Sequence, residues 1–233
     1  KHTVDAFVAL EDKTFWKHHG FNWKRMIGAI ASSFGRGNIR GTSTLTQQLA
    51  RNVYLPNIKS QRSARRKILE MYYASKIEHT LSKKEIFAAY VNSIYFGYGN
   101  YGIENASKTY FSKDVSQLTL KESAALASMP QSPDTYALIQ NADSPVASQS
   151  TSTPIKIDGK SYIANDISKP RRQIALKLMA DQGYITRAEY EENAASNLAD
   201  FLNPSLNAGR ETDTSYFTDY MVEQIIKDLM KKY

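Results

Sequence analysis

Hydrophobic residues recur at helical spacing along most of this chain. Val4–Glu11 is a short apolar run, and Trp23–Phe34 carries apolar residues three and four positions apart. Residues at this spacing line one face of an α-helix. Similar patterns predict further helices over Ser63–Leu81, Pro170–Gly183, Thr186–Ala199 and Tyr216–Lys232.

Four capping-box patterns mark the starts of predicted helices. In this pattern, a Ser or Thr precedes a Glu or Gln by three residues, and each side chain binds the other residue's backbone N–H. The four pairs are Thr44 and Gln47, Ser82 and Glu85, Thr119 and Glu122, and Thr186 and Glu189. The first pair predicts a helix that ends before Pro56, the second a helix through Asn92, and the third a helix that Pro130 stops.

The segment Asn141–Lys169 departs from the helical pattern. It is rich in Ser, Thr, Asn and Asp, which predicts a long loop or insertion with a small hairpin around Asp158–Gly159. The fold is therefore predicted to be mainly α, with at most minor β. We expect one domain over residues 1–203, followed by a linker and the start of a further region in residues 204–233.

Composition adds two constraints. The 233 residues, 42% of them hydrophobic, suffice for one large domain with a sizeable core, and the absence of cysteine excludes disulfides. The longest apolar helical stretch, Met26–Phe34, is too short to span a bilayer. Because the chain opens on Lys1, we expect it to be a portion of a longer protein whose membrane anchor lies outside it.

Positive charge is concentrated in the first third of the chain. Residues 1–80 hold 14 Lys and Arg against 5 Asp and Glu, whereas residues 81–233 hold 16 against 18. A basic segment of this kind predicts an anionic partner, such as phosphate, nucleic acid or an acidic membrane surface. A solvated basic surface is the alternative interpretation.

Two carboxylates are candidates for acid–base chemistry. Glu11 and Asp12 end an apolar run and precede Phe15 and His18. A carboxyl group beside buried aromatic surface can have a raised pKa, which suits a general acid or base. An acidic pair exposed at a helix end is the alternative interpretation. The adjacent His18 and His19 suggest a metal site, but a third ligand at a fitting spacing is absent from the sequence.

Three further segments carry candidate binding groups. Gly41–Asn52 is unusually polar for a helix start, where free N–H groups favour an anion. Arg66 and Lys67 precede Glu70 by about one helical turn, which suits either a phosphate clamp or a surface ion pair. The tyrosine-rich and glycine-rich stretch Tyr90–Tyr110 is typical of a sugar-stacking surface or of a packed loop.

In combination and in this order, these segments resemble the five motifs of the family 51 glycosyltransferases. Glu11–Gly20 resembles EDxxFxxHxG, Gly41–Asn52 is similar to GxSTLTQQLxKN, and Arg66–Glu70 resembles RKxxE. Ile86–Phe111 and Leu120–Pro130 resemble the fourth and fifth motifs. This family supplies the glycan-polymerising domain of bifunctional class A penicillin-binding proteins and of monofunctional transglycosylases. The second motif usually carries lysine where this chain has arginine.

The resemblance implies a lysozyme-like helical larger lobe and a smaller membrane-facing lobe at residues 22–41. It implies polymerisation of lipid II into β-1,4-linked glycan strands of peptidoglycan, with inversion and release of polyprenyl pyrophosphate. The implied partners are lipid II, the growing glycan chain, the membrane surface, and proteins of cell-wall synthesis and division, but no nucleic acid. The implied location is the outer face of the bacterial cytoplasmic membrane, with residues 204–233 leading to a transpeptidase domain.

The resemblance also assigns residues. Glu11 is expected to be the catalytic base and Glu70 the second catalytic glutamate. The expected substrate-binding residues are Asp12, Phe15, His18, Gly41, Ser43, Thr44, Thr46, Gln47, Gln48, Arg51, Asn52, Arg66 and Lys67. Mg²⁺ or Mn²⁺ is the expected cofactor, with Asp12 as a candidate ligand, and no organic cofactor is expected.

Three alternatives stay open at this point. A lysozyme-like hydrolase or lytic transglycosylase would also use a glutamate, although Arg51, Arg66 and Lys67 argue for a pyrophosphate instead. A basic nucleic-acid or membrane-binding module leaves Glu11 and Glu70 unexplained. A degenerate synthase kept as a scaffold is the third, and the two glutamates argue against it.

Overall fold

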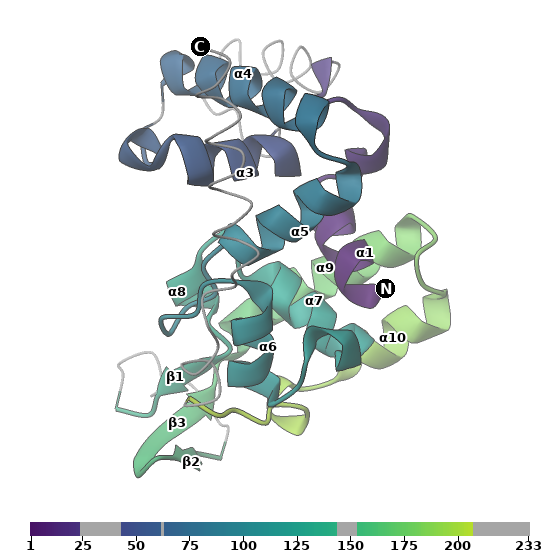
Figure 1. Cartoon of the computed structure of the whole chain (residues 1–233). Coiled ribbons are helices and arrows are strands. Elements are labelled where there is room, and N and C mark those ends of the chain that lie inside the picture. The colour runs from purple at the N-terminus through teal and green to yellow at the C-terminus, as the bar shows by residue number, and fades with distance from the viewer. Residues whose placement is uncertain (24–42, 62, 144–152, 207–233) are drawn as a thin grey trace, which may run out of the picture. The chain divides into compact units, whose positions relative to one another are not determined.

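The computed structural model describes residues 1–23, 43–61, 63–143 and 153–206, and over these ranges it is mainly helical, as predicted (Figure 1). The α-helices are α1 (His2–Glu11), α3 (Leu45–Tyr54), α4 (Ala64–Thr80), α5 (Lys83–Ser93), α6 (Ile103–Phe111), α7 (Leu120–Ser128), α8 (Pro133–Tyr136), α9 (Lys169–Asp181) and α10 (Arg187–Ala195). Short 3-10 helices cover Phe15–Lys17, Pro56–Ile58, Val115–Gln117, Asp166–Ser168 and Leu198–Asp200. Residues 24–41 of the predicted membrane-facing lobe and the predicted helix Tyr216–Lys232 lie outside the described residues.

The chain divides into two compact units. Unit 1 contains Lys1–Leu10 and continues from Ile94, and unit 2 contains Glu11–Ser93. Most of the residues expected to carry chemistry belong to unit 2.

All four predicted capping boxes form. Thr44, Thr119 and Thr186 each accept a bond from the third helical residue, whose side chain accepts a bond from the cap backbone. At the start of α5, the Ser82 N–H donates to Glu85 Oε2 at 2.7 Å. These local pairs fix where the helices begin, so the predicted and observed starts agree within two residues, whereas α10 ends at Ala195, four residues before the predicted end.

In unit 2, α3 packs against α4 and α5. Leu45 and Leu49 of α3 are buried, as are Ala74 and Ile77 of α4. The rings of Tyr54 and Tyr73 stack between α3 and α4, with centroids 4.7 Å apart and planes 5° from parallel. This aromatic contact and the apolar seam hold the two helices side by side (Figure 1).

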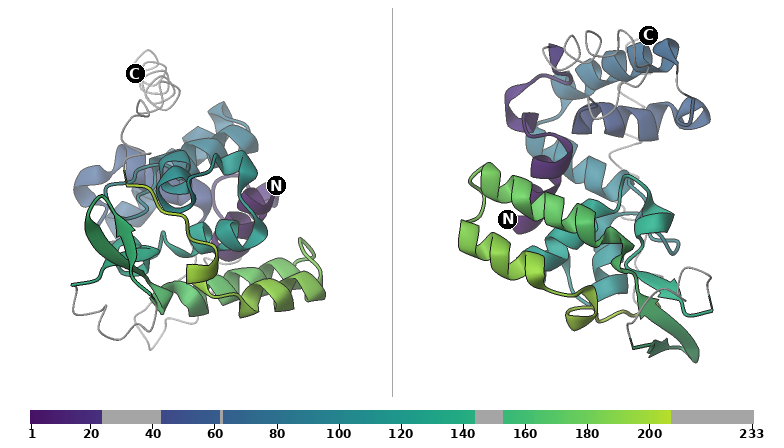
Figure 2. Two further views of the ribbon diagram at one scale, coloured as in Figure 1. Left: turned by 90° about the horizontal axis from the view of Figure 1, so that it is seen from below. Right: turned by 180° about the vertical axis from the view of Figure 1, so that it is seen from behind.

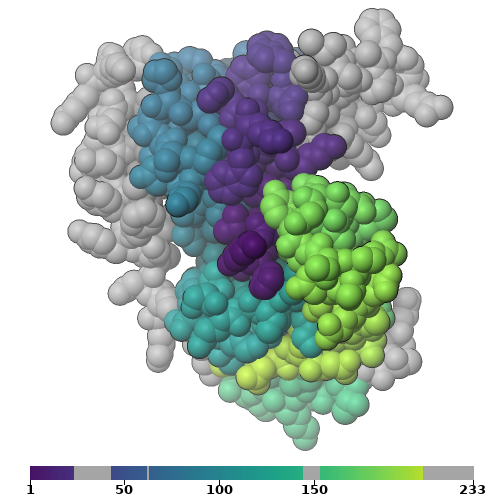
Figure 3. All heavy atoms as spheres, turned by 90° about the vertical axis from the view of Figure 1, so that its right-hand side faces the viewer, coloured from purple at the N-terminus to yellow at the C-terminus, as the bar shows by residue number. Residues whose placement is uncertain are grey.

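In unit 1, α7 is the central helix. All of its residues except Lys121 are buried, which is expected of a helix enclosed by other elements. α9 packs on α7, and α10 packs on α9, so that α9 and α10 lie side by side (Figure 2). Together with the segment that follows, they form one continuous stretch of the surface (Figure 3).

Unit 1 also contains a small antiparallel sheet, ordered β1-β3-β2, of Ile139–Asn141, Lys160–Ala164 and Ile155–Ile157. Ile157 pairs with Lys160, so Asp158 and Gly159 form the predicted two-residue hairpin turn, which is confirmed. The prediction of a long loop over Asn141–Lys169 was too simple, because strands and a 3-10 helix occupy much of it. Its many Ser and Thr residues obscured the buried run Tyr162–Ala164 of β3.

Two neighbouring glycines give a matched stability test in unit 1. Gly97 and Gly99 have φ values of 75° and 78°, a region that strains other residues. A Cβ on Gly97 would lie 3.0 Å from the Ala137 Cβ and 3.1 Å from the Pro133 oxygen, whereas one on Gly99 meets nothing within 4 Å. Gly99→Ala should therefore cost about 1–2 kcal/mol of unfolding free energy. Gly97→Ala should cost at least about 1 kcal/mol more, because it adds overpacking. Urea unfolding of both variants measures this, and equal losses would contradict it.

Candidate active site

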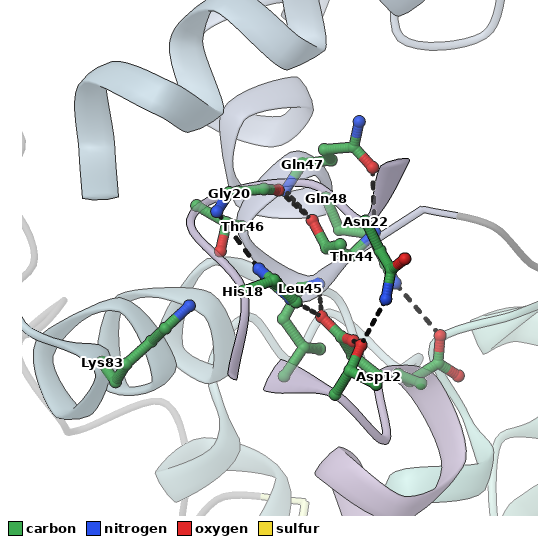
Figure 4. A network of polar contacts seen from close by, with 12 residues as sticks. Asp12, His18, Gly20, Asn22, Thr44, Leu45, Thr46, Gln47, Gln48 and Lys83 are labelled. Carbon is green, nitrogen blue, oxygen red and sulfur yellow. Dashed lines mark hydrogen bonds and ion pairs between the residues drawn. The ribbon is translucent and has the colours of Figure 1, made fainter. Parts of the chain in front are cut away.

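The buried carboxylate of Asp12 holds the loop that follows Glu11 against the start of α3 (Figure 4). Asp12 is 1% exposed, and its Oδ2 accepts hydrogen bonds from His18 Nε2 at 2.8 Å and from the Leu45 N–H at 3.1 Å. The Gly20 N–H donates to His18 Nδ1 at 3.1 Å. Since Nδ1 accepts, Nε2 carries the proton that His18 donates to Asp12. Asp12 therefore joins the residue after α1 to the first turn of α3.

A second set of bonds fixes the same turn. The Thr44 hydroxyl donates to the Gly20 carbonyl and accepts from the Gln47 N–H at 3.1 Å. Gly20 lies with φ at 94°, and a Cβ there would lie 3.1 Å from the Ala74 carbonyl carbon. Only glycine allows this close approach of the loop to α4. The start of α3 is thus fixed by both the loop and its own cap.

Glu11 is held from α3. The Gln48 amide nitrogen donates to Glu11 Oε2 at 3.1 Å, and the Tyr90 hydroxyl donates to the Gln48 carbonyl oxygen at 3.4 Å. Tyr90 is buried, whereas Glu11 and Gln48 are half-buried. Gln48 therefore orients the carboxylate of Glu11 while leaving part of its surface open to solvent.

Three cations surround the buried carboxylate of Glu70. Lys67 Nζ lies 2.7 Å from Glu70 Oε2, and Arg66 Nε and Arg51 Nη1 lie 3.2 and 3.9 Å from Oε1. The side chain of Glu70 is 0% exposed, whereas those of its partners are 16–28% exposed. Lys67 also donates to the Ser43 hydroxyl at 2.7 Å. One carboxylate cannot neutralise three cations, so this cation cluster keeps a positive, partly exposed face suited to phosphate.

Three residues that were expected to bind the substrate are fully buried in this structure. Phe15, Thr44 and Thr46 are 0% exposed. Phe15 packs edge-on against Trp16 and His18, and Thr46 donates to Glu78 Oε1 at 2.6 Å. These three side chains pack within the protein and connect the loop after Glu11 and α3 to the rest of unit 2.

The other expected residues divide in a similar way. Asp12, His18 and Gln47 are buried in the loop and cap network. Ser43 and Lys67 are joined by their hydrogen bond, and Arg51 and Asn52 are half-buried on α3. Gly41 lies outside the described residues.

The expected metal ligand does not fit a metal site. Asp12 Oδ2 already accepts two bonds from protein donors, and Oδ1 accepts one from Thr14 at 3.3 Å. Over the described ranges, no group of three His, Cys, Asp or Glu residues is placed to hold a metal ion. Asp12 is therefore a structural anchor in this fold.

Sequence reasoning missed Glu78 and Lys83, which contact the network, and placed Tyr90 only in a sugar-stacking or packed stretch. Glu78 Oε1 lies 2.6 Å from both Thr46 Oγ1 and Lys83 Nζ. The available signal was an acidic residue beside the apolar positions Ala74 and Ile77 on the buried face of α4. A charged residue on such a face needs partners.

Together, the fold and the site define a class of protein: a mainly helical protein that combines an oriented carboxylate with a partly exposed cation cluster. Comparison with known proteins assigns this class to a family. A family described as transglycosylase matches residues 1–153, and the chain belongs to this family. The peptidoglycan glycosyltransferase class inferred from the motifs is thereby confirmed.

The chain is similar to several curated penicillin-binding proteins. It is 44% identical over 227 residues to penicillin-binding protein 2D of Bacillus subtilis, covering 97% of this chain and 29% of that protein. It is 34% identical over 234 residues to penicillin-binding protein 1A of Aquifex aeolicus, covering 100% of this chain and 27% of that protein. The chain thus spans less than a third of the length of these relatives.

A solved structure, penicillin-binding protein 1A of Haemophilus influenzae, is 22% identical with a TM-score of 0.34, covering 80% of this chain and 20% of that one. Within the described part of the chain, no helix has the length and apolar character needed to cross a bilayer.

The stacked ring of Tyr54 should make the stability of the fold depend on pH. Burial, and to a lesser extent Tyr73, raises the pKa of Tyr54 to about 12. The fold therefore favours the neutral phenol, and its stabilisation is complete below pH 10 and lost as pH rises towards 12. Tyr54→Phe cannot ionise, so its melting temperature should gain on the wild type above pH 10. Thermal melts from pH 8 to 11.5 measure this, with exposed Tyr101→Phe as control; a constant difference would contradict it.

Proposed function

We propose that this domain polymerises lipid II into β-1,4-linked glycan strands of peptidoglycan, inverting the anomeric carbon and releasing polyprenyl pyrophosphate. One observation carries the proposal. The short helix α3 holds Glu11 through Gln48 and contributes Arg51 to the cation cluster. A base for the acceptor and positive charge for the leaving group are the two requirements of this reaction.

Glu11 acts as the base. The 4-hydroxyl of the acceptor sugar attacks the anomeric carbon of the growing chain and loses its proton to the Glu11 carboxylate. The bond from that carbon to the pyrophosphate oxygen breaks, and its electron pair leaves with the pyrophosphate. The hydrogen bond from Gln48 restricts the direction of the carboxylate, which supports proton transfer only in the aligned complex.

The cation cluster receives the leaving group. Arg66 and Lys67 present donors close to Glu70, and Arg51 adds a third positive charge. Glu70 orients these side chains, while their exposed surfaces contact the pyrophosphate oxygens. Because the cations are positioned before reaction, little reorganisation is needed as negative charge develops.

Ser43, Gln48 and Asn52 complete the set of residues that contact the substrate. The buried residues Asp12, His18, Thr44 and Gln47 hold this set in place. Mg²⁺ or Mn²⁺, where it assists, would bind mainly through substrate oxygens, since Asp12 is occupied by protein donors.

We further infer that the domain works at the outer face of the bacterial cytoplasmic membrane. There, residues 22–41 contact the lipid surface, and residues 204–233 lead towards a transpeptidase domain. The penicillin-binding relatives and their greater length support this arrangement. Proteins of cell-wall synthesis and division are the partners that such a location implies.

Replacing the base tests the reaction directly. Glu11→Gln keeps the size of the side chain but cannot accept the proton, so polymerisation should fall about 10²–10⁴-fold. Labelled lipid II in detergent, with products separated by length, measures this; Glu192→Gln on α10 is the control for removing a surface carboxylate. Activity within tenfold of wild type would exclude Glu11 as the base.

Replacing a cation tests the leaving-group site. Lys67→Ala removes the closest partner of Glu70 and should lower kcat about 10²–10³-fold. Arg65→Ala, two positions earlier on the exposed part of α4, is the matched control and should retain near-normal activity. Equal losses in both variants would show that overall positive charge, and not this cluster, matters.

A further inference from the structure

Glu78 is a buried carboxylate to which the proposed mechanism assigns no role. Its side chain is 6% exposed, and its Oε1 receives hydrogen bonds from Thr46 Oγ1 and Lys83 Nζ, each at 2.6 Å. His18 Nδ1 lies 3.9 Å from the same oxygen. Three segments of unit 2 therefore meet at this one group: α3, α5 and the loop that follows Glu11.

Burying a carboxylate carries a large desolvation cost, and an ion pair recovers it only when the geometry is good. Buried pairs of this kind are weak contributors to stability relative to apolar packing, but they can specify one arrangement of the elements they join. Glu78 meets this condition, because both short bonds reach it from different helices.

Glu78 acts on the first turn of α3. Thr46 is the second residue of that helix, and Asp12 and Thr44 hold the adjacent positions from the loop and the cap. Glu78 supplies the fixed point from α4. A carboxylate at this end also matches the positive N-terminal pole of the helix dipole.

The position of that turn decides where Gln48 lies. Gln48 is two residues beyond Thr46, and its amide nitrogen is 3.1 Å from Glu11 Oε2. A small rotation or shift of α3 would move the amide away from the carboxylate. Since hydrogen bonds weaken steeply with distance and angle, Glu11 would lose its orientation.

We propose that Glu78 is a positioning residue for the catalytic base, acting through Thr46 and the first turn of α3 on the contact between Gln48 and Glu11. This inference rests on the proposed function, in which Glu11 takes the acceptor proton. Lys83 contributes to the same positioning. Its ammonium group lies 4.7 Å from the centre of the Phe15 ring and so connects Glu78 to the loop after Glu11.

The test is a double-mutant comparison. Thr46→Val removes the donor of this bond, whereas Glu78→Gln removes the charge that pairs with Lys83 and weakens the bond from Thr46. Both keep side-chain size, and each should lower kcat about 10–100-fold with KM within about twofold. In a Gln48→Ala background, where the contact with Glu11 is already absent, the same changes should lower kcat less than about threefold further. Undiminished loss in that background, or normal kcat in Glu78→Gln, would overturn the proposal.

Glu122→Gln controls for a general loss of stability. Glu122 in unit 1 is also a buried carboxylate, with a side chain 3% exposed and Lys113 Nζ at 2.6 Å. Its replacement should lower the melting temperature about as much as Glu78→Gln does and leave kcat unchanged. A fall of kcat in proportion to stability in both variants would make Glu78 merely structural.

A readout without turnover separates this proposal from the proposed function. The carboxyl carbon of Glu11, followed by NMR, should shift in Glu78→Gln and Gln48→Ala but not in Glu122→Gln. If the wild-type chain, supplied with a membrane anchor, polymerises no lipid II, the proposed function fails and the NMR result still decides whether Glu78 orients Glu11. An unchanged Glu11 signal in Glu78→Gln overturns the positioning role alone.

Discussion

The hydrogen bonds that Asp12 accepts are the constraint on which the site depends. One carboxylate oxygen, 1% exposed, receives both the imidazole of His18 and the first helical N–H of α3. Asp12 is the direct neighbour of Glu11, so fixing Asp12 also fixes the backbone that carries Glu11, the proposed base. Partial positive charge at the start of α3 favours this buried carboxylate, and the neutral His18 adds a donor without a second charge. The loop can therefore be rigid while Glu11 itself stays half-buried.

Because its start is fixed in this way, helix α3 also fixes the positions of the polar side chains that it contributes to the site. Its residues Gln48, Arg51 and Asn52 stand at i, i+3 and i+4, so they share one face, and all three are half-buried. The adjoining face buries Leu45, Leu49 and Ala50 in the core of unit 2. Packing of the apolar face therefore sets the rotation of the polar face. Glu11 and Arg51 cannot shift independently, because Gln48, which holds Glu11, and Arg51 belong to one rigid element.

The parts of this fold that could be predicted are those encoded over a few residues. Capping boxes join positions three apart, and the Asp158–Gly159 turn joins adjacent strands, so both are visible in the sequence. The burial of Phe15 and Thr46 was missed because it depends on elements far along the chain: Phe87 faces Phe15, and Glu78 lies 32 residues from Thr46. The motif resemblance named the residues of the site, but only the packing separates those that face a substrate from those that support them.

The two glutamates of α4 show why that separation matters. Glu70 and Glu78 are both buried on the same helix, and both bind cations. Around Glu70 the three cations are partly exposed, so the ion pairs leave positive charge available to a ligand. Around Glu78 the partners are one lysine and one hydroxyl, each at 2.6 Å, so its charge is balanced within the protein. Glu70 and Glu78 therefore have different roles on one helix, and the difference follows from the number and exposure of their partners. α4 presents an electrostatic surface near its start and fixes the geometry of α3 near its end.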